Sequence, residues 1–336
     1  MSWITVADIV SMTIAFAVPL MLVALGGMFS ERSGIINLAL EGIMIIGALA
    51  GSLTVNKLQS FLLKNPEHFL AKNPTLCVFI ALIAAAVVGI IFSILLAFAA
   101  INLRADQTIG GTALNIFAPA IAVIITWAIQ GQGQTTINIP SWTRMSESSF
   151  GLETANDFVH TLVFKNLYLT TIIAIFVLII STVVLYKTKF GLRLRACGEH
   201  PQAADSVGIN VKKMRYAGVM ISGALAGMGG LAYTLASGSG FQSTVGGYGF
   251  LALAVMIFGN WKPVRIMAAS LFFALFRFIG FSSASISFLP QFESLSNAHY
   301  IYKIIPYVIT MIVLVFTSKR SQAPKAEGIP YDKGQR

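Results

Sequence analysis

The chain has 336 residues, of which 56% are hydrophobic and only 11% are charged. A soluble domain carries about 25% charged residues, so this composition predicts a polytopic membrane protein and excludes a soluble catalytic domain. The net charge of +10 would also suit a nucleic-acid partner, but the basic residues are distributed as membrane topology requires, and we expect no nucleic acid.

Apolar runs of about 18 residues or more can cross the ~30 Å hydrocarbon core of a bilayer as helices. The sequence predicts nine or ten such spans in one all-α transmembrane bundle that occupies residues 1–317. The seventh span is short, and the glycine-rich residues before it could tilt, break or extend it. The nine spans that can be placed are residues 5–28, 34–53, 76–100, 109–130, 167–185, 216–236, 248–260, 264–282 and 301–317.

Lysine and arginine accumulate in the loops of one side. With the C-terminus inside, the inner loops and the tail hold 16 of the 23 basic residues, and the outer loops hold five. Because cytoplasmic loops are the basic ones, we expect the C-terminus in the cytoplasm, with the basic face near anionic membrane lipid. The polar tail at residues 318–336 is expected to be disordered and basic.

The stretch ERSGIINLALEG, residues 31–42, places two polar side chains in an otherwise apolar region. Asn37 and Glu41 are four residues apart, which puts them on one face of a helix. A carboxylate within a membrane almost always faces the bundle interior or a wet cavity. We expect both side chains to face the interior, where they either bond neighbouring helices or line a pathway, with Arg277 as a candidate partner of Glu41.

The fourth span begins with ADQTIGGTALN, in which Asn115 brings an amide into the membrane. Amide groups suit neutral solutes that are rich in hydrogen-bonding groups, such as bases and sugars. The alternative is that Asn115 only bonds a neighbouring helix.

The loop at residues 186–215 is the longest and most polar of the inner loops. Its stretch HPQAADSVGI predicts a short helix, because Pro201 suits a first helical turn and Gly208 suits a stop. Basic residues on both sides would hold this helix against the membrane face. It is either a docking element for a cytosolic motor subunit or a solvated loop.

Residues 222–260 contain ten glycines and no charged side chain. Such backbone between two spans is typical of a broken helix or a re-entrant turn that lines a cavity, although a flexible outer turn has the same composition. Phe241 and Tyr248 would supply stacking and hydrogen-bonding groups there.

The sequence lacks the motifs that would make this chain an enzyme. It has no GxxxxGK[ST] and therefore no P-loop for ATP, no HExxH, and no cysteine and histidine cluster that could hold a metal. Its two cysteines are expected on opposite sides of the membrane and unpaired. We expect no cofactor or metal bound by the chain itself.

Two pairs of short segments repeat along the chain. GALAG occurs at 47–51 and at 223–227, and LALEGIMIIG, residues 38–47, aligns with LALAVMIFG, residues 251–259, when one residue is skipped. The second pair is expected to run in opposite directions, as an internal inverted repeat requires, but short apolar matches also arise by chance.

Three stretches together carry a resemblance to a known family: ERSGIINLALEGIMIIGALAG, ADQTIGGTALN and GLRLRACGEHPQAADSVGINVKKMRYAGVMISGALAGMGGLAY. They resemble the permease subunits of bacterial ABC importers for branched-chain amino acids, ribose and simple sugars. Within that class they are most similar to nucleoside and purine permeases paired with basic-membrane-protein lipoproteins. The resemblance covers roughly residues 15–317.

The resemblance implies a type II importer fold, with short and tilted helices, in the bacterial cell membrane. It implies three partners: a cytosolic ABC ATPase with two nucleotide-binding domains that uses ATP and Mg²⁺, a second homologous permease, and an extracytoplasmic substrate-binding lipoprotein. The coupling helix seated in the ATPase would then comprise Glu199, His200, Pro201, Ala204 and Gly208.

The function expected from these observations is the passive pathway of an ATP-driven importer of nucleosides or purines. Two alternatives stay open: the same machinery importing ribose, another simple sugar or a branched-chain amino acid, and a proton-coupled secondary carrier that uses a membrane carboxylate. The absence of an assembled catalytic set argues against a membrane enzyme. The residues expected to line the pathway are Asn37, Glu41, Asn115, Phe241 and Tyr248.

Overall fold

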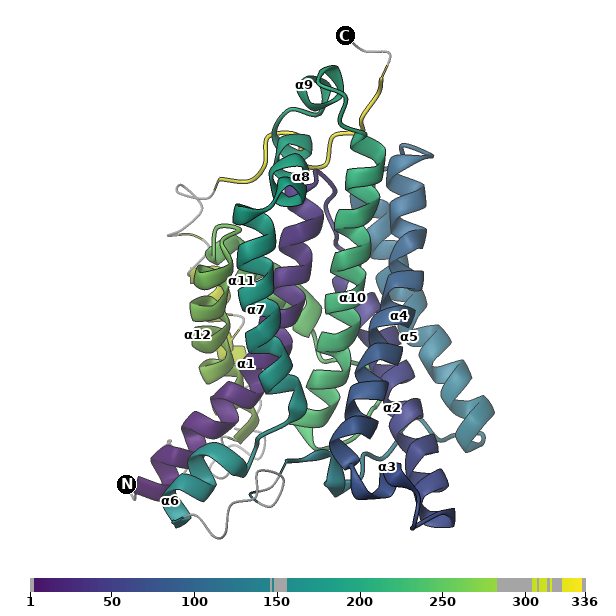
Figure 1. Cartoon of the computed structure of the whole chain (residues 1–336), viewed down its shortest axis with the longest axis vertical. Coiled ribbons are helices and arrows are strands. Elements are labelled where there is room, and N and C mark those ends of the chain that lie inside the picture. The colour runs from purple at the N-terminus through teal and green to yellow at the C-terminus, as the bar shows by residue number, and fades with distance from the viewer. Residues whose placement is uncertain are drawn as a thin grey trace.

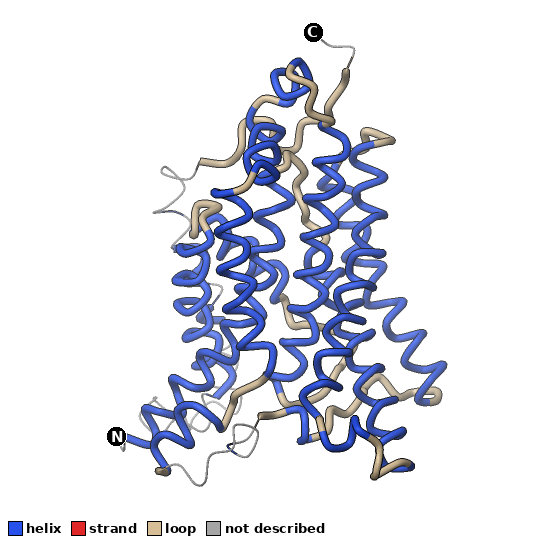
Figure 2. The backbone as a smooth tube through the Cα atoms, in the orientation of Figure 1, coloured by secondary structure: helices blue, strands red, loops and turns tan. Residues whose placement is uncertain are grey.

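The computed structural model describes residues 3–145, 147, 156–282, 304–306, 308–312, 315 and 322–333. Over these ranges the regular structure is helical, apart from two isolated bridges that pair Ile137 with Phe241 and Arg144 with Tyr168. Figure 2 shows the described chain as a bundle of helices joined by loops. The prediction of an all-α fold is confirmed for these residues.

Six helices in the described ranges are long and apolar enough to cross a membrane, namely α1 (Trp3–Arg32), α4 (Pro74–Ile101), α5 (Gln107–Gln130), α7 (Leu169–Lys187), α10 (Val211–Ser237) and α12 (Pro263–Ser282). Two further helices belong to the bundle, α2 (Leu40–Lys64) and α11 (Tyr248–Phe258) (Figure 1). The short elements are α3 (Phe69–Lys72), η1 (Ser141–Thr143), α6 (Asp157–Val159), η3 (His160–Phe164), α8 (Lys189–Glu199) and α9 (Pro201–Ser206).

These helices account for the first eight predicted spans. Helix α2 departs most from its prediction, and α10 begins at Val211 instead of residue 216. The second span is predicted at residues 34–53, but α2 begins at Leu40 and continues to Lys64. The chain leaves the helix before α2 because Gly34 has φ +96°, a left-handed conformation that glycine adopts readily. The ninth predicted span, residues 301–317, lies mostly outside the described residues.

Helix α10 forms the centre of the bundle. It packs along α1 on one side and along α2 and α4 on the other (Figure 1). In both α1 and α10, 72% of the residues in the most apolar 18-residue stretch are buried. The corresponding share is 17% in α5 and 22% in α7. The exposed side chains of α5 and α7 include Ile116 and Ile179, so these two helices form an apolar outer surface of the kind that faces lipid or another protein.

Glycine lets α10 approach its neighbours at backbone distance. A Cβ on Gly227 would lie 2.2 Å from the carbonyl oxygen of Ala85 in α4, and a Cβ on Gly47 in α2 would lie 2.3 Å from the Cα of Gly227. A Cβ on Gly89 in α4 would lie 2.3 Å from the carbonyl oxygen of Gly223. The two GALAG segments of the sequence therefore touch each other at Gly47 and Gly227.

Helices α2 and α11 start at the same depth and run in opposite directions. Gly249, at the start of α11, lies against Glu41 at the start of α2. The chain that follows α11 reaches the end of α1, where Trp261 donates from Nε1 to Glu31 at 2.6 Å, whereas α2 leads to the opposite end of the bundle (Figure 1). The predicted opposition of these helices is confirmed, and the inverted repeat itself stays a prediction.

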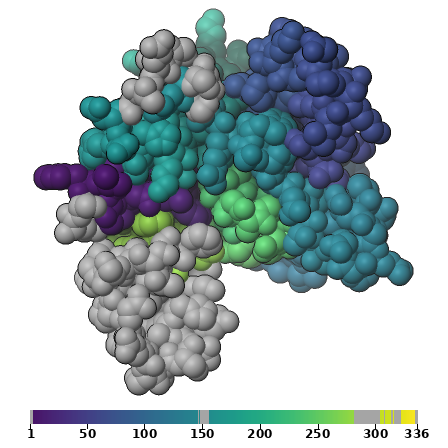
Figure 3. Space-filling model, turned by 90° about the horizontal axis from the view of Figure 1, so that it is seen from below, coloured from purple at the N-terminus to yellow at the C-terminus, as the bar shows by residue number. Residues whose placement is uncertain are grey.

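The two ends of the bundle carry different elements. Helices α8 and α9 and residues 322–333 cover one end, while α3, α6 and the start of α1 lie at the other (Figure 1). The glycine-rich segment at residues 238–247 reaches the surface at the centre of this second end, where Figure 3 shows it in green.

The prediction of a disordered tail at residues 318–336 does not hold for residues 322–333. Ala326 and Tyr331 are buried, and the N–H of Ala326 donates to the carbonyl oxygen of Gly198 at 2.8 Å. The polar composition indicated disorder, but composition does not reveal the partners that α8 and other distant segments supply.

We expect Gly227→Ala to destabilise the fold, because the new Cβ would collide with the backbone of α4. Overpacking typically costs about 1–3 kcal/mol, which lowers the midpoint of thermal unfolding in detergent by several degrees. Gly110→Ala is the matched control, since its Cβ meets only a methyl group of Leu96 at 3.6 Å. Equal midpoints for the two variants would contradict this account of the packing.

Candidate functional site

The chain between α1 and α2, residues 33–39, is non-helical backbone inside the bundle. It runs alongside α10, with Ser33 against Gly218, and Asn37 donates from Nδ2 to the hydroxyl oxygen of Ser222 at 2.8 Å. Non-helical backbone at membrane depth is stable only where protein groups satisfy its hydrogen bonds. The partners of this segment therefore identify the side chains on which the fold depends.

Two amide side chains of α5 supply several of these bonds. Gln107 accepts at Oε1 from the N–H of Ile36 at 2.8 Å. Asn115 donates from Nδ2 to the carbonyl oxygen of Leu38 at 2.6 Å and accepts at Oδ1 from the N–H of Gly42 at 2.8 Å. Asn115 therefore bridges the end of the non-helical segment and the first turn of α2.

The structure corrects the prediction that Asn37 and Glu41 share one face of a helix. Asn37 precedes α2, and its Oδ1 accepts from the N–H of Ala39 at 3.1 Å. The reason is the left-handed turn at Gly34, which interrupts the helix that a four-residue spacing presupposes. Both side chains are buried, so the prediction that they face the interior is confirmed.

Glu41, in the first turn of α2, ties that helix to the start of α11. Its carboxylate oxygens accept from the N–H groups of Gly247 at 2.8 Å and Gly249 at 2.6 Å. Helix N-termini carry partial positive charge, which favours a carboxylate between them. A Cβ on Gly249 would lie 2.3 Å from the backbone nitrogen of Glu41, so a larger residue would separate the two helices.

Arg277 of α12 holds the same turn from another side. It donates from Nη2 to the carbonyl oxygen of Gly246 at 2.8 Å. Its guanidinium carbon lies 5.3 Å from the centroid of the Tyr248 ring, within cation–π range, and that ring packs on Tyr233 at 4.5 Å. Glu41 and Arg277 thus brace one turn together.

Residues 37–42 and 246–249 meet in the bundle, and we call them the mid-bundle junction. Four of the five predicted pathway residues lie in this junction or bond to it. Phe241 lies apart from it and exchanges backbone hydrogen bonds with Ile137, at 2.9 Å in both directions. Phe241 and Tyr248 are each 1% exposed, so neither is open to solvent in this conformation. A role in lining a pathway stays a prediction for all five. The four residues at the junction are Asn37, Glu41, Asn115 and Tyr248.

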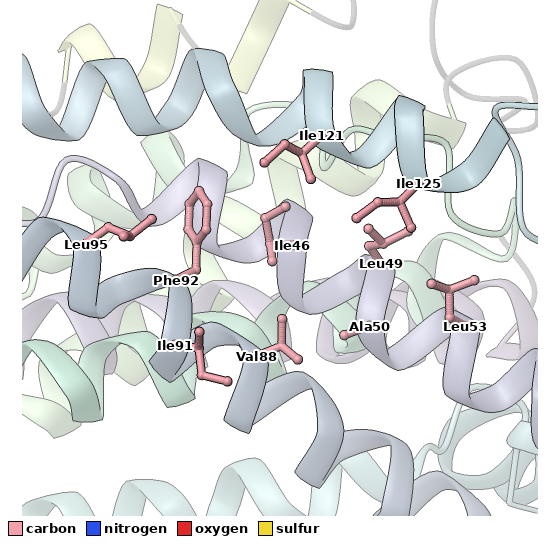
Figure 4. A pocket seen from close by; sticks show the side chains of 10 residues that line it. All are labelled: Ile46, Leu49, Ala50, Leu53, Val88, Ile91, Phe92, Leu95, Ile121 and Ile125. Carbon is pink, nitrogen blue, oxygen red and sulfur yellow. The ribbon is translucent and has the colours of Figure 1, made fainter. Parts of the chain in front are cut away.

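A separate apolar crevice of about 350 Å³ lies between α2, α4 and α5. Figure 4 shows its lining, in which every labelled side chain is hydrocarbon. A nucleoside or sugar needs polar groups that fix its orientation, so this crevice does not fit a polar solute. The lining residues are Ile46, Leu49, Ala50, Leu53, Val88, Ile91, Phe92, Leu95, Ile121 and Ile125.

Helices α8 and α9 form the loop that the sequence predicts as a coupling element. Pro201 begins α9, and Gly208 follows it with φ +84°, so the predicted short helix is confirmed with its start and its stop. A Cβ on Gly198 would lie 2.4 Å from the carbonyl oxygen of Arg32, so glycine there lets α8 lie on the end of α1. Glu199 pairs with Arg32 at 3.7 Å.

The two faces of α9 have different surroundings. Pro201 and Ala204 are buried against the protein, whereas His200 is exposed. The outward face carries Ala203 and Val207, and Val207 is 75% exposed. Ala204, which the sequence predicts as a coupling residue, thus faces inward, because the orientation of so short a helix depends on the segments packed beneath it.

Cys197 is a buried free thiol in α8. Burial raises its pKa to about 11, although the nearby Arg215 opposes that shift. The thiol therefore stays protonated at neutral pH and is unreactive as a nucleophile.

The apolar helices, the buried non-helical segment and the short helix at one end together define a multi-pass helical membrane protein. Residues 9–314 match a family described as the permease component of the branched-chain amino acid transport system, and the chain belongs to this family of permeases.

The chain is 41% identical to guanosine ABC transporter permease protein NupQ of Bacillus subtilis, over 98% of this chain and 97% of that protein. It is 39% identical to nucleoside ABC transporter permease protein NupC of Lactococcus lactis, over 98% of each. It is 28% identical to putative glucose ABC transporter permease protein TsgC13 of Haloferax volcanii, over 94% of this chain and 93% of that protein. No solved structure matches the chain. The resemblance stated from the sequence is confirmed.

We expect Glu41→Gln to destabilise the mid-bundle junction. A glutamine side chain has one acceptor oxygen, so the N–H of Gly247 or Gly249 would face an amide NH2 instead of an acceptor. A buried polar group without a partner costs about 1–3 kcal/mol, which should lower the midpoint of thermal unfolding in detergent. Glu67→Gln, at a side chain that is 95% exposed, is the control, and a similar midpoint for both variants would show that the carboxylate is dispensable.

Proposed function

We propose that this chain is the pathway-forming subunit of an ATP-driven importer of nucleosides and purines. The proposal rests chiefly on the match over nearly the whole chain to two permeases whose names specify guanosine and nucleosides. The sequence has no P-loop, so we assign ATP hydrolysis to a separate subunit.

The end of the bundle that carries α8 and α9 faces the cytosol of a bacterial cell. The concentration of basic residues in the loops of this side supports that orientation. A cytosolic ATPase with two nucleotide-binding domains, which uses ATP and Mg²⁺, binds the outward face of α9. Ala203 and Val207 offer the apolar contact for this binding. Pro201 and Gly208 fix where the helix begins and ends, and Glu199 ties the end of α8 to Arg32 of α1.

Two other partners complete the transporter. A second homologous permease covers part of the apolar surface of α5 and α7, which the single chain leaves exposed. A lipid-anchored substrate-binding protein docks at the opposite end, where Gln242 and Thr244 of the glycine-rich segment are exposed.

Closure of the ATPase displaces α9, and the displacement reaches the mid-bundle junction. Two helices begin at this junction instead of crossing it, so they can be displaced without breaking the main-chain bonds of a continuous helix. Asn37, Glu41, Asn115 and Tyr248 then line the route, and Phe241 lies nearer its outer mouth. Their amide, carboxylate and phenol groups match the hydrogen-bonding groups of a base and a ribose.

Other solutes have specific but weaker support. A sugar is supported by the likeness to a permease named for glucose, and a branched-chain amino acid by the description of the family. A proton-coupled carrier based on Glu41 has less support, because both carboxylate oxygens are engaged by N–H groups that hold α11 in place.

Uptake by sealed vesicles that contain this chain with the products of its neighbouring genes tests the proposal. We expect ATP-dependent accumulation of labelled guanosine and uridine, and none of ribose, glucose or leucine. An ATPase-inactive partner should abolish uptake, while collapse of the proton gradient should not. Uptake of a sugar or of leucine instead would contradict the proposed substrate class. Uptake that follows the proton gradient without ATP would contradict the proposed mechanism.

Val207→Asp tests docking of the ATPase on α9, because it places a charge in an apolar contact. We expect nucleoside-stimulated ATP hydrolysis by the reconstituted complex to fall about tenfold, equivalent to ~1.4 kcal/mol of lost interaction. Ser60→Asp adds the same charge at an exposed position near the end of α2, outside the glycine-rich segment, and should leave stimulation unchanged. Normal stimulation in Val207→Asp would place the ATPase elsewhere.

A further inference from the structure

Residues 322–333, which we call the tail, cross the end of the bundle that carries α8 and α9 (Figure 1, in yellow). The N–H of Gln322 donates to Oδ1 of Asn260, just after α11, at 3.1 Å. The N–H of Ala326 donates to the carbonyl oxygen of Gly198 in α8 at 2.8 Å. The tail therefore joins segments that are far apart in the sequence.

The middle of the tail lies directly on the non-helical segment between α1 and α2. The N–H of Gly328 donates to the carbonyl oxygen of Gly34 at 3.3 Å. Gly328 has φ +75°, and a Cβ there would lie 2.8 Å from Cδ1 of Ile36. A residue with a side chain at this position would be strained and would lift the tail from the segment.

Two arginines hold the second half of the tail. Arg215 of α10, only 1% exposed, donates from Nη1 to the carbonyl oxygen of Ile329 at 3.0 Å. Arg104, in the loop before α5, forms a bidentate pair with Asp332 at 2.8 and 3.0 Å. The tail is thus held by a buried arginine that binds its backbone and by a second arginine that pairs with its own Asp332.

Tyr331 places the tail beneath α9. Its side chain is buried in one cluster with Ala204 of α9, Cys197 of α8 and Val211 of α10. A helix as short as α9 has little stability of its own, so its position depends on what its inner face packs against. Tyr331 is one of the few large side chains that supply this packing.

We propose that the tail is a positioning segment that couples α9 to the mid-bundle junction, with Tyr331 and Gly328 as its two contact points. This inference rests on the proposed function, in which α9 receives the ATPase. A displacement of α9 moves Tyr331, and the tail backbone transmits it to Gly34 and Ile36, next to Asn37. Helix α10 provides one connection between α9 and the junction, and the tail provides a second that does not pass through the bundle core.

The test uses the complete transporter reconstituted in lipid vesicles, with guanosine as the solute. Gly328→Val lifts the tail from the non-helical segment, and Tyr331→Ala removes the packing beneath α9. We expect each variant to reduce guanosine-stimulated ATP hydrolysis by about fivefold or more, with basal hydrolysis and the half-saturating guanosine concentration unchanged. Tyr331→Phe keeps the ring, and Lys333→Ala changes an exposed neighbour, so both should retain wild-type stimulation.

Two outcomes would overturn the proposal: normal stimulation in both Gly328→Val and Tyr331→Ala, or an equal fall of basal and stimulated hydrolysis, which would reduce the tail to a stabilising element. If either variant fails to assemble, reversing the ion pair between Arg104 and Asp332 tests the proposal instead. Arg104→Asp and Asp332→Arg should each lower stimulation, and the double reversal should restore it; lack of restoration would overturn the proposal. Failure of the proposed function is distinct, since the wild-type complex would then show no guanosine stimulation at all.

Discussion

One constraint governs this structure: every backbone N–H and C=O group within a bilayer must find its hydrogen bond inside the protein. A continuous helix meets this constraint alone, but the chain leaves the helix inside the bundle at residues 33–39, and the glycine-rich segment at residues 238–247 returns from the bundle surface to the mid-bundle junction. Amide side chains of α5 complete the first segment. Glu41, Arg277 and the pairing with Ile137 complete the second. The polar residues that look costly in the sequence are therefore those that make the breaks stable.

The mid-bundle junction contains residues that stabilise the fold and are also candidate functional residues. The close contacts among α2, α4 and α10 leave no room for a Cβ at Gly47 or Gly227, so the helices around the junction are held at fixed spacing. If this region moves during transport, its residues must both hold the fold together and allow the movement. Stabilising substitutions most often reduce activity at residues of this kind. Glu41 is the clearest example, because it holds α11 and is also a predicted pathway residue.

Features with a local signal could be predicted from the sequence. Apolar length gave the spans, and a proline followed by a glycine gave the start and stop of α9, because both signals act within a few residues. The interior placement of Asn37 and Glu41 followed from the cost of burying polar groups in lipid. These inferences required no knowledge of which segments meet.

The remaining features depend on contacts between distant segments. A glycine such as Gly34 suits close helix packing as well as a left-handed turn, so the sequence did not show that the helix ends there. The partners of Glu41, at Gly247 and Gly249, lie about two hundred residues further along the chain, beyond any periodic pattern. The order of the tail and the outward orientation of Val207 likewise depend on neighbours that composition cannot identify.

The start of α1 and the tail lie at opposite ends of the bundle (Figure 1). A chain that places two such segments on opposite faces crosses the bilayer an odd number of times between them. Each aqueous compartment therefore has access to only one of these two segments. A protease or a label confined to one compartment meets either the start of α1 or the tail with α8 and α9, and never both.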